Sequence, residues 1–121
     1  MPRSGQFVKM ALSHVLPIYK DTYRLILRLF ELTQHFSKEY KYSLGQDIKR
    51  DAICLVRSIY RANRNQQKRT YVEEFLDNFE VLKLELRLCA DLKLFSIKHQ
   101  AEITVLIESI GKQATAWKNS Y

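Results

Sequence analysis

The sequence predicts an all-α fold, an antiparallel up-down four-helix bundle. Apolar residues recur at steps of three and four through four segments of about 20 residues, which places them along one side of each helix. The chain contains only three glycines and two prolines, and no segment alternates apolar and polar residues as a half-buried strand does. Its 121 residues are the size of one domain. We expect the bundle over residues 17–119 and a partly ordered extension at residues 1–16.

The first helix is predicted to run from Pro17 to about Phe36. Proline fits the first turn of a helix because its missing N–H would have no partner there. The apolar stripe is wide, which is typical of a helix packed between two neighbours. Its core row is Ile18, Thr22, Leu25, Leu29, Leu32 and Phe36, and a second row is Tyr19, Tyr23, Ile26 and Phe30.

The second helix is predicted to start at a capping box formed by Ser43 and Gln46. In this motif each side chain bonds the backbone N–H of the other residue. The helical period breaks in the polar run of residues 63–67. The core row of this helix is Leu44, Ile48, Ala52, Leu55, Ile59 and Ala62.

The third helix is predicted from a second capping box, Thr70 with Glu73, to roughly Leu94. It is apolar on more than one side, and such surplus apolar surface usually marks a subunit contact. Its core row is Val72, Phe75, Phe79, Leu82, Leu86 and Cys89, and the surplus residues are Leu76, Leu84, Leu88 and Leu92.

The fourth helix is predicted to be capped by Ser96. Gly111 lies inside this helix and is interpreted as a close helix–helix contact. Short connections between the four helices favour antiparallel neighbours. The core row of the fourth helix is Ile103, Ile107, Ile110, Ala114 and Trp117.

Composition predicts a cytoplasmic protein with no membrane association. Hydrophobic residues make up 46% and charged residues 27% of the chain, which is typical of a globular domain. No apolar run approaches the ~20 residues that span a bilayer, and the first residues lack a signal-peptide core. Cys54 and Cys89 are expected to be buried free thiols, since neither has a metal-ligand partner nearby in sequence.

No pattern in the chain predicts an enzyme, a metal site or a cofactor. His14, His35 and His99 belong to no two-histidine or Glu-x-x-His pattern and are expected to have surface or capping roles. The carboxylate pairs Glu80 with Glu85 and Asp47 with Asp51 are interpreted as solvated helix faces, because no inward-facing carboxylate recurs on all four helices. Phosphate-binding glycine loops and activated nucleophile signatures are missing from the sequence.

The basic residues give the stronger functional signal. The formal net charge is +7, and residues 41–69 hold eight basic against two acidic side chains. Such a concentrated positive field favours a polyanion or an acidic protein surface as partner. On the second helix the basic residues are spaced by seven, four, three and four, which stacks them on one face. This row is Arg50, Arg57, Arg61, Arg64 and Lys68.

Because arginine suits bidentate phosphate contact, we interpret this row as a nucleic-acid-binding surface. The alternative is the polar face that every amphipathic helix needs. On the third helix Lys83 and Arg87 form a shorter row. A secondary row on the first helix is Lys20, Arg24 and Arg28, for which a solvated face and a binding face remain equally open.

The order of residues also resembles a known family, over nearly all of residues 16–119. The motifs are LPIYKDTY at 16–23, YSLGQD at 42–47 with Arg50 and Asp51, IYRAN at 59–63, ELRLC at 85–89, and IGKQ at 110–113 with Trp117. They resemble the accessory variability determinants of diversity-generating retroelements. A related group is encoded in intervening sequences of ribosomal RNA genes.

The resemblance implies a homopentameric barrel of four-helix bundles. It implies that the protein is not an enzyme but binds RNA or DNA and the reverse transcriptase of the retroelement, and supports mutagenic copying of template RNA. It further implies that Lys83 and Arg87 face the central channel of the barrel. The alternative is an oligomeric protein-binding scaffold of the ribosomal intervening-sequence type, without a reverse transcriptase partner.

Overall fold

The computed structural model describes residues 15–121, which form four long helices and one single-turn helix. The predicted extension lies outside the described residues, except that its last two residues begin the first helix, and it stays a prediction. The helices are α2 (Val15–Thr33), α3 (Lys38–Lys41), α4 (Leu44–Arg64), α5 (Lys68–Asp91) and α6 (Ile97–Asn119).

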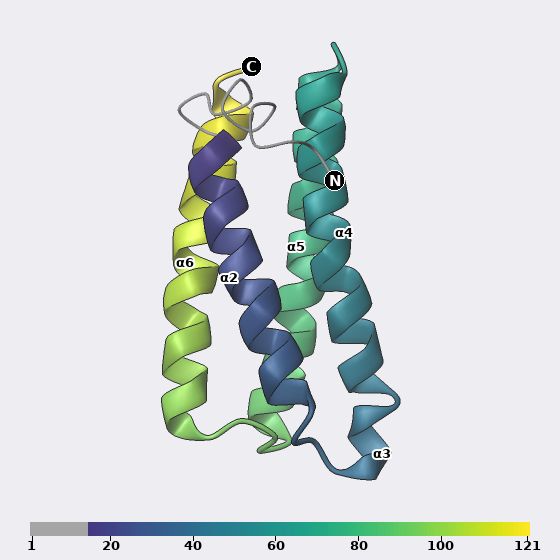
Figure 1. The fold of residues 1–121 in the computed structure, drawn as a ribbon. Helices are drawn as coiled ribbons and strands as arrows, with labels where there is room; N and C mark the ends of the chain where they lie inside the picture. Colours follow the sequence, from purple (N-terminus) through teal and green to yellow (C-terminus); the bar gives the residue numbers. More distant parts are fainter. Residues whose placement is uncertain (1–14) are drawn as a thin grey trace.

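The long helices form an up-down bundle (Figure 1). α2 packs against α4 and α6, and α5 packs against the same two helices on the other side, so each long helix neighbours the next along the chain. α3 belongs to the connection from α2 to α4 and lies at the lower end of the bundle in Figure 1, below the first turn of α4. Residues 15–121 contain no strand. The prediction of an all-α four-helix bundle is therefore confirmed.

The predicted core rows lie in the interior. Every residue of the α2 and α5 rows is buried, and on α4 and α6 only Leu44 and Ile107 remain half-buried. An aromatic cluster joins α5 to α6, with ring centroids 6.0 Å apart for Phe75 and Phe79 and 6.4 Å apart for Phe75 and Trp117. Such pairs add about 0.5–1.5 kcal/mol each beyond the burial of their area.

One of the three predicted helix caps is confirmed. Ser96 caps α6, since its hydroxyl accepts a hydrogen bond from the backbone N–H of His99 at 3.1 Å. The capping box at Ser43 is wrong, because this hydroxyl instead donates to the carbonyl of Glu39 in the preceding turn at 2.8 Å. The capping box at Thr70 is also wrong, because α5 begins two residues earlier, at Lys68.

Two helices end about three residues before the predicted positions. α2 ends at Thr33 and α5 at Asp91. At the end of α5, the N–H of Leu94 bonds the carbonyl of Cys89 at 2.8 Å, and the N–H of Lys93 bonds that of Ala90 at 3.0 Å. This is a Schellman motif, which requires a left-handed residue just past the helix. Lys93 occupies that position with φ 60°.

None of the helices within residues 15–121 has both the length and the apolar character needed to cross a lipid bilayer.

Candidate nucleic-acid interface

The basic row of α4 lies on the side of the helix opposite its core row, along the boundary with α5. The guanidinium of Arg61 crosses that boundary, and its Nη1 lies 3.2 Å from Oε1 of Glu74 on α5. The side chains of Arg57 and Arg64 are exposed on the same face. Helical spacing therefore aligns these three arginines over about two turns.

Two members of the row have carboxylate partners. Arg50 lies between Asp47, at 3.4 Å, and Asp51, at 3.3 Å. Arg61 has Glu74, and both side chains of this pair are about two-fifths exposed. Ion pairs of this exposure contribute about 0–1 kcal/mol to stability. Their larger effect is to cancel positive charge at both positions.

Arg57 and Arg64 keep their full charge. Within residues 15–121 neither guanidinium forms an ion pair or a side-chain hydrogen bond. Because Arg57 and Arg64 are seven residues apart, their Cα atoms lie on one side of α4, about 10 Å apart along the helix. These two residues are the part of the predicted row that is available to an anionic ligand.

Lys68 is engaged within the chain. Its ammonium donates to the carbonyl of Ala62 at 3.0 Å and to that of Asn63 at 3.2 Å. These carbonyls belong to the last turn of α4, where no intrahelical donor is available. Lys68 therefore closes the turn between α4 and α5, and this contact accounts for the early start of α5.

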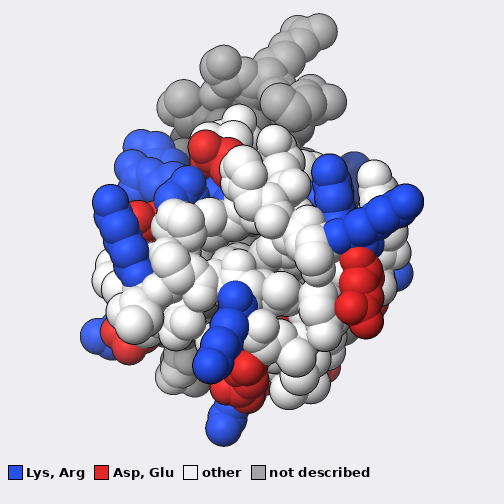
Figure 2. Space-filling view, turned by 90° about the horizontal axis from the view of Figure 1, so that it is seen from below, with Lys and Arg blue, Asp and Glu red and all other residues white. Residues whose placement is uncertain are grey.

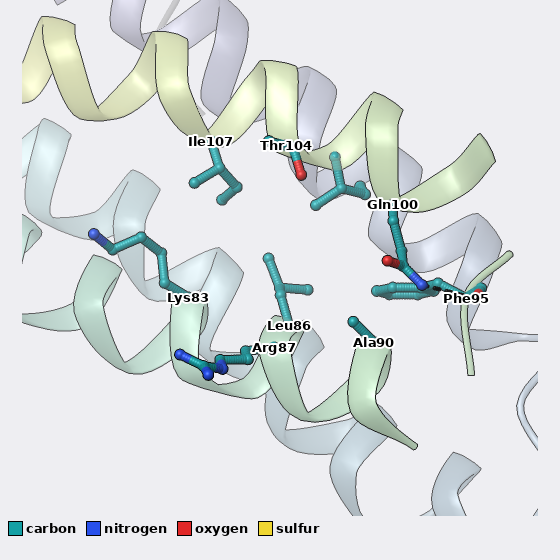
Figure 3. A pocket seen from close by; sticks show the side chains of 9 residues that line it. Lys83, Leu86, Arg87, Ala90, Phe95, Gln100, Thr104 and Ile107 are labelled. Carbon is teal, nitrogen blue, oxygen red and sulfur yellow. Dashed lines mark hydrogen bonds between the residues drawn. The ribbon is translucent and has the colours of Figure 1, made fainter. Parts of the chain in front are cut away.

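Lys83 and Arg87 lie on another side of α5, away from the α4 row. Lys83 follows Glu74 by nine residues, which is two and a half helical turns and places them on opposite sides of the helix. Both basic residues line a groove between α5 and α6 (Figure 3). The structure therefore does not join these two predicted site residues to the row on α4.

The secondary row on α2 is mostly paired. Nε of Arg28 lies 2.9 Å from Oε2 of Glu102 on α6, and Nη1 of Arg24 lies 3.1 Å from Oδ1 of Asp21. Of the three residues in this row, only Lys20 is exposed and has no ion pair with another described residue. These contacts favour the interpretation of the α2 row as a packing and surface feature.

Asp21 also belongs to a polar network between α2 and α6 that sequence reasoning missed. Its Oδ2 accepts hydrogen bonds from the hydroxyl of Ser109 at 2.9 Å and from the amide of Gln113 at 2.6 Å. Ser109 and Gln113 are four residues apart and so share one side of α6, and this spacing was the signal that the sequence offered. The network fixes the register of α2 against α6.

The interpretation of Glu85 as part of a solvated face is wrong. Glu85 is 9% exposed, and its Oε1 is buried with no hydrogen-bond partner among the described residues. Burial raises the pKa of Glu85 to about 8. The carboxyl of Asp51 on α4, which shares a hydrogen bond with the side chain of Glu85, raises this pKa further. Glu85 therefore holds a proton near neutral pH, because two carboxylates this close cannot both ionise cheaply.

The cysteines are free thiols, as predicted, although Cys54 is only half-buried. Burial is the main cause that raises the pKa of the Cys89 thiol to about 12, and the nearby Glu85 is the smaller cause. A thiol with so high a pKa forms little thiolate and is unreactive. Cys89 therefore has a packing role.

The end of the bundle that carries α3 is shown in Figure 2. Lysine and arginine side chains stand at separate places around this end, several of them beside acidic residues, and uncharged side chains cover the area between them. This end of the bundle therefore carries no continuous basic surface.

The described residues define a basic all-helical bundle protein, in which the two arginines without a carboxylate partner, Arg57 and Arg64, both lie on the outside of α4. No group of three or more His, Cys, Asp or Glu side chains within residues 15–121 is placed to hold a metal ion. Residues 16–121 match the sequence model of the bAvd-like family, and the chain belongs to that family. The predicted resemblance to accessory variability determinants is confirmed. A search of curated proteins found no match to the chain.

Proposed function

We propose that the protein is a non-enzymatic accessory factor of a diversity-generating retroelement, which binds the template RNA and the reverse transcriptase. Membership of the bAvd-like family is the observation that carries the proposal. In this role the protein forms no bonds itself. It holds RNA near the polymerase through phosphate contacts and thereby supports mutagenic copying.

The α4 row is the part of the surface that we assign to RNA. Arg57 and Arg64 are exposed and have no carboxylate partner within the described chain, and arginine binds phosphate in a bidentate fashion. Arg61 lies between them, and its ion pair with Glu74 is exposed enough to exchange for a phosphate. Arg50 and Lys68 take a smaller part in this assignment, since both are engaged internally.

Self-association is the second part of the proposal. Four apolar side chains of α5 are exposed by 42–60%, and they follow one another at steps of three and four along the helix. These residues are Val81, Leu84, Leu88 and Leu92. A monomeric protein rarely leaves such a stripe uncovered. We assign it to the contact between subunits of a homo-oligomer, with the pentamer implied by the resemblance as the expected state.

The alternative function is an oligomeric protein-binding scaffold of the ribosomal intervening-sequence type. The same exposed apolar stripe favours it, because apolar surface binds protein rather than phosphate. In this alternative Arg57 and Arg64 meet acidic side chains of a partner protein. The arginine row alone does not distinguish the two functions. A binding experiment is needed to distinguish them.

Binding to the template RNA tests the proposal directly. The double variant Arg57→Glu and Arg64→Glu should lower RNA affinity by at least tenfold, with unchanged helical circular dichroism, since both side chains are exposed and unpaired. The control, Lys98→Glu with Lys112→Glu, makes the same charge change on exposed residues of α6 and should have a much smaller effect. Equal losses in both variants would refute a specific α4 site. Unchanged RNA affinity in the α4 variant, together with loss of a nuclease-resistant contact to a protein other than a reverse transcriptase, would favour the scaffold.

A further inference from the structure

A groove of about 230 Å³ lies between α5 and α6 near the loop that connects them. Its floor is apolar and is made by Leu86 and Ala90 of α5, Ile103 and Ile107 of α6, and Phe95 of the loop. In Figure 3 the side chains of Leu86 and Ile107 point into the space between the two helices. Leu86, Phe95 and Ile103 form the buried bottom of the groove, and Ala90 and Ile107 are half-buried nearer its opening.

The rim of the groove is polar and positively charged on one side. Lys83 and Arg87 of α5 form one edge, Gln100 and Thr104 of α6 form the other, and no carboxylate lines the groove. The carboxylates that contact the two cations sit above and below it on α5: Glu80 lies 2.7 Å from Lys83, and Asp91 lies 4.0 Å from Arg87. At that distance, and with its side chain 81% exposed, Arg87 keeps most of its donors for a ligand.

The dimensions of the groove limit its occupant. A volume of about 230 Å³ is below the ~300–1,000 Å³ of typical small-molecule sites. Its α5 wall, from Lys83 to Ala90, spans seven residue steps, or about 10 Å along the helix. That length accommodates two side chains one helical turn apart, because residues four apart rise about 6 Å. An amphipathic helix lying in a groove presents anchors with this spacing.

We propose that the α5–α6 groove binds an amphipathic helix of a partner protein. Two apolar side chains of that helix, one turn apart, enter the floor, and a carboxylate beside them pairs with Arg87 and Lys83. Arg87, whose carboxylate neighbour is 4.0 Å away, favours an acidic partner, whereas Lys83 would have to exchange Glu80 for the new carboxylate. The inference is independent of RNA binding by α4, and it assigns Lys83 and Arg87 to a protein ligand.

The apolar floor separates this assignment from RNA binding. RNA bound through phosphates would use the two cations and leave Leu86, Ile103 and Ile107 without a role. An acidic amphipathic helix uses both the rim and the floor. Binding should therefore respond to changes in the apolar residues of the ligand as well as to changes in its charges.

The test uses the full chain and a pair of labelled helical peptides of about 16 residues. Both present two leucines four residues apart, flanked by glutamates in one peptide and by lysines in the other. The native chain should bind the glutamate peptide at least tenfold more tightly than the lysine peptide, and leucine-to-alanine changes should abolish binding. In the Arg87→Glu variant this preference should reverse, which a mere loss of folding would not produce.

Two control variants place the peptide on the protein. Filling the groove by Ala90→Leu should lower the affinity for the glutamate peptide at least tenfold. The variant Arg57→Gln with Arg64→Gln should leave this affinity unchanged. The proposal is overturned if neither peptide binds, if the leucines are dispensable, or if Arg87→Glu leaves the preference intact. It is also overturned if Arg87→Glu weakens RNA binding as strongly as Arg57→Glu with Arg64→Glu does, since the rim of the groove would then be an RNA site.

Discussion

Arg57 and Arg64 lie seven residues apart on the outer face of α4, and neither meets a carboxylate within the described chain. Arg61, between them, is held by Glu74 of α5 at 3.2 Å. The row thus combines two permanently available cations with a third whose charge is partly cancelled. Because α4 is a rigid element of the bundle, the spacing of these groups is fixed before any ligand arrives.

Removing the charge of Glu74 should strengthen RNA binding. In Glu74→Gln the guanidinium of Arg61 loses its partner and becomes the third free cation of the row. We expect a rise in RNA affinity of several-fold and a loss of at most about 1 kcal/mol in the free energy of unfolding. Fluorescence anisotropy with labelled template RNA measures the first, and urea unfolding the second. An unchanged affinity would mean that Arg61 is not part of the RNA site.

The buried carboxyl of Glu85 should make stability depend on pH. Its pKa is about 8 in the folded protein against an ordinary value of 4.5, so the folded state binds the proton more tightly than the unfolded chain. The stabilising contribution is therefore complete below pH 4.5 and is lost as the pH rises to 8, with a slope of at most ~1.4 kcal/mol per pH unit.

The variant Glu85→Gln isolates this effect, because the amide keeps the shape of the side chain and does not titrate. Between pH 5 and pH 8 the free energy of unfolding of the native protein should fall relative to that of the variant. Urea titrations at a series of pH values measure the difference. Parallel curves for the two proteins would show that Glu85 is ionised throughout this range.

Replacing Lys93 by glycine should stabilise the bundle. Lys93 holds the left-handed position of the Schellman motif that ends α5, with φ 60°. Glycine adopts this conformation without the clash of a Cβ atom. We expect a gain of about 0.5–1 kcal/mol in the free energy of unfolding. A neighbouring exposed control, Lys98→Gly, should destabilise because it places glycine within α6, and a loss in both variants would contradict the account.

Charges placed in the apolar stripe of α5 should break the oligomer. In Leu84→Glu with Leu88→Glu, two residues that are 60% and 42% exposed become acidic, and burying them between subunits would cost several kcal/mol. Light scattering should show smaller particles that keep their helical content. Thr115→Glu with Ala116→Glu on α6 is the matched control and should assemble normally. If both variants assemble alike, the stripe does not form the subunit contact.

The core rows could be predicted from the sequence because a helical period is a local property. The rows from Ile18 to Phe36 and from Val72 to Cys89 are buried without exception. The start of α4 after Ser43 was predicted correctly, but its side-chain cap and the start of α5 at Thr70 were wrong, because contacts outside the two motifs decided them. Ser43 bonds back to Glu39, and Lys68 bonds the end of the preceding helix.

The state of the charged residues could not be predicted, because ion pairs depend on which helices are neighbours. Arg61 and Glu74 are 13 residues apart, and Arg28 and Glu102 are 74 apart. The burial of Glu85 could not be predicted from the sequence for the same reason, since its partner Asp51 lies on another helix, α4. The basic rows were visible in the sequence, but only the bundle separates the free cations from the paired ones.

The salt dependence of RNA binding tests the central claim most directly. Each phosphate contact contributes ~0.7–0.9 to the slope of log affinity against log salt concentration. The slope for Arg57→Gln with Arg64→Gln should therefore be shallower than that of the native protein by about 1.4–1.8, while Lys98→Gln with Lys112→Gln should keep the native slope. An α4 variant with the native slope and affinity would contradict the assignment of this surface to RNA.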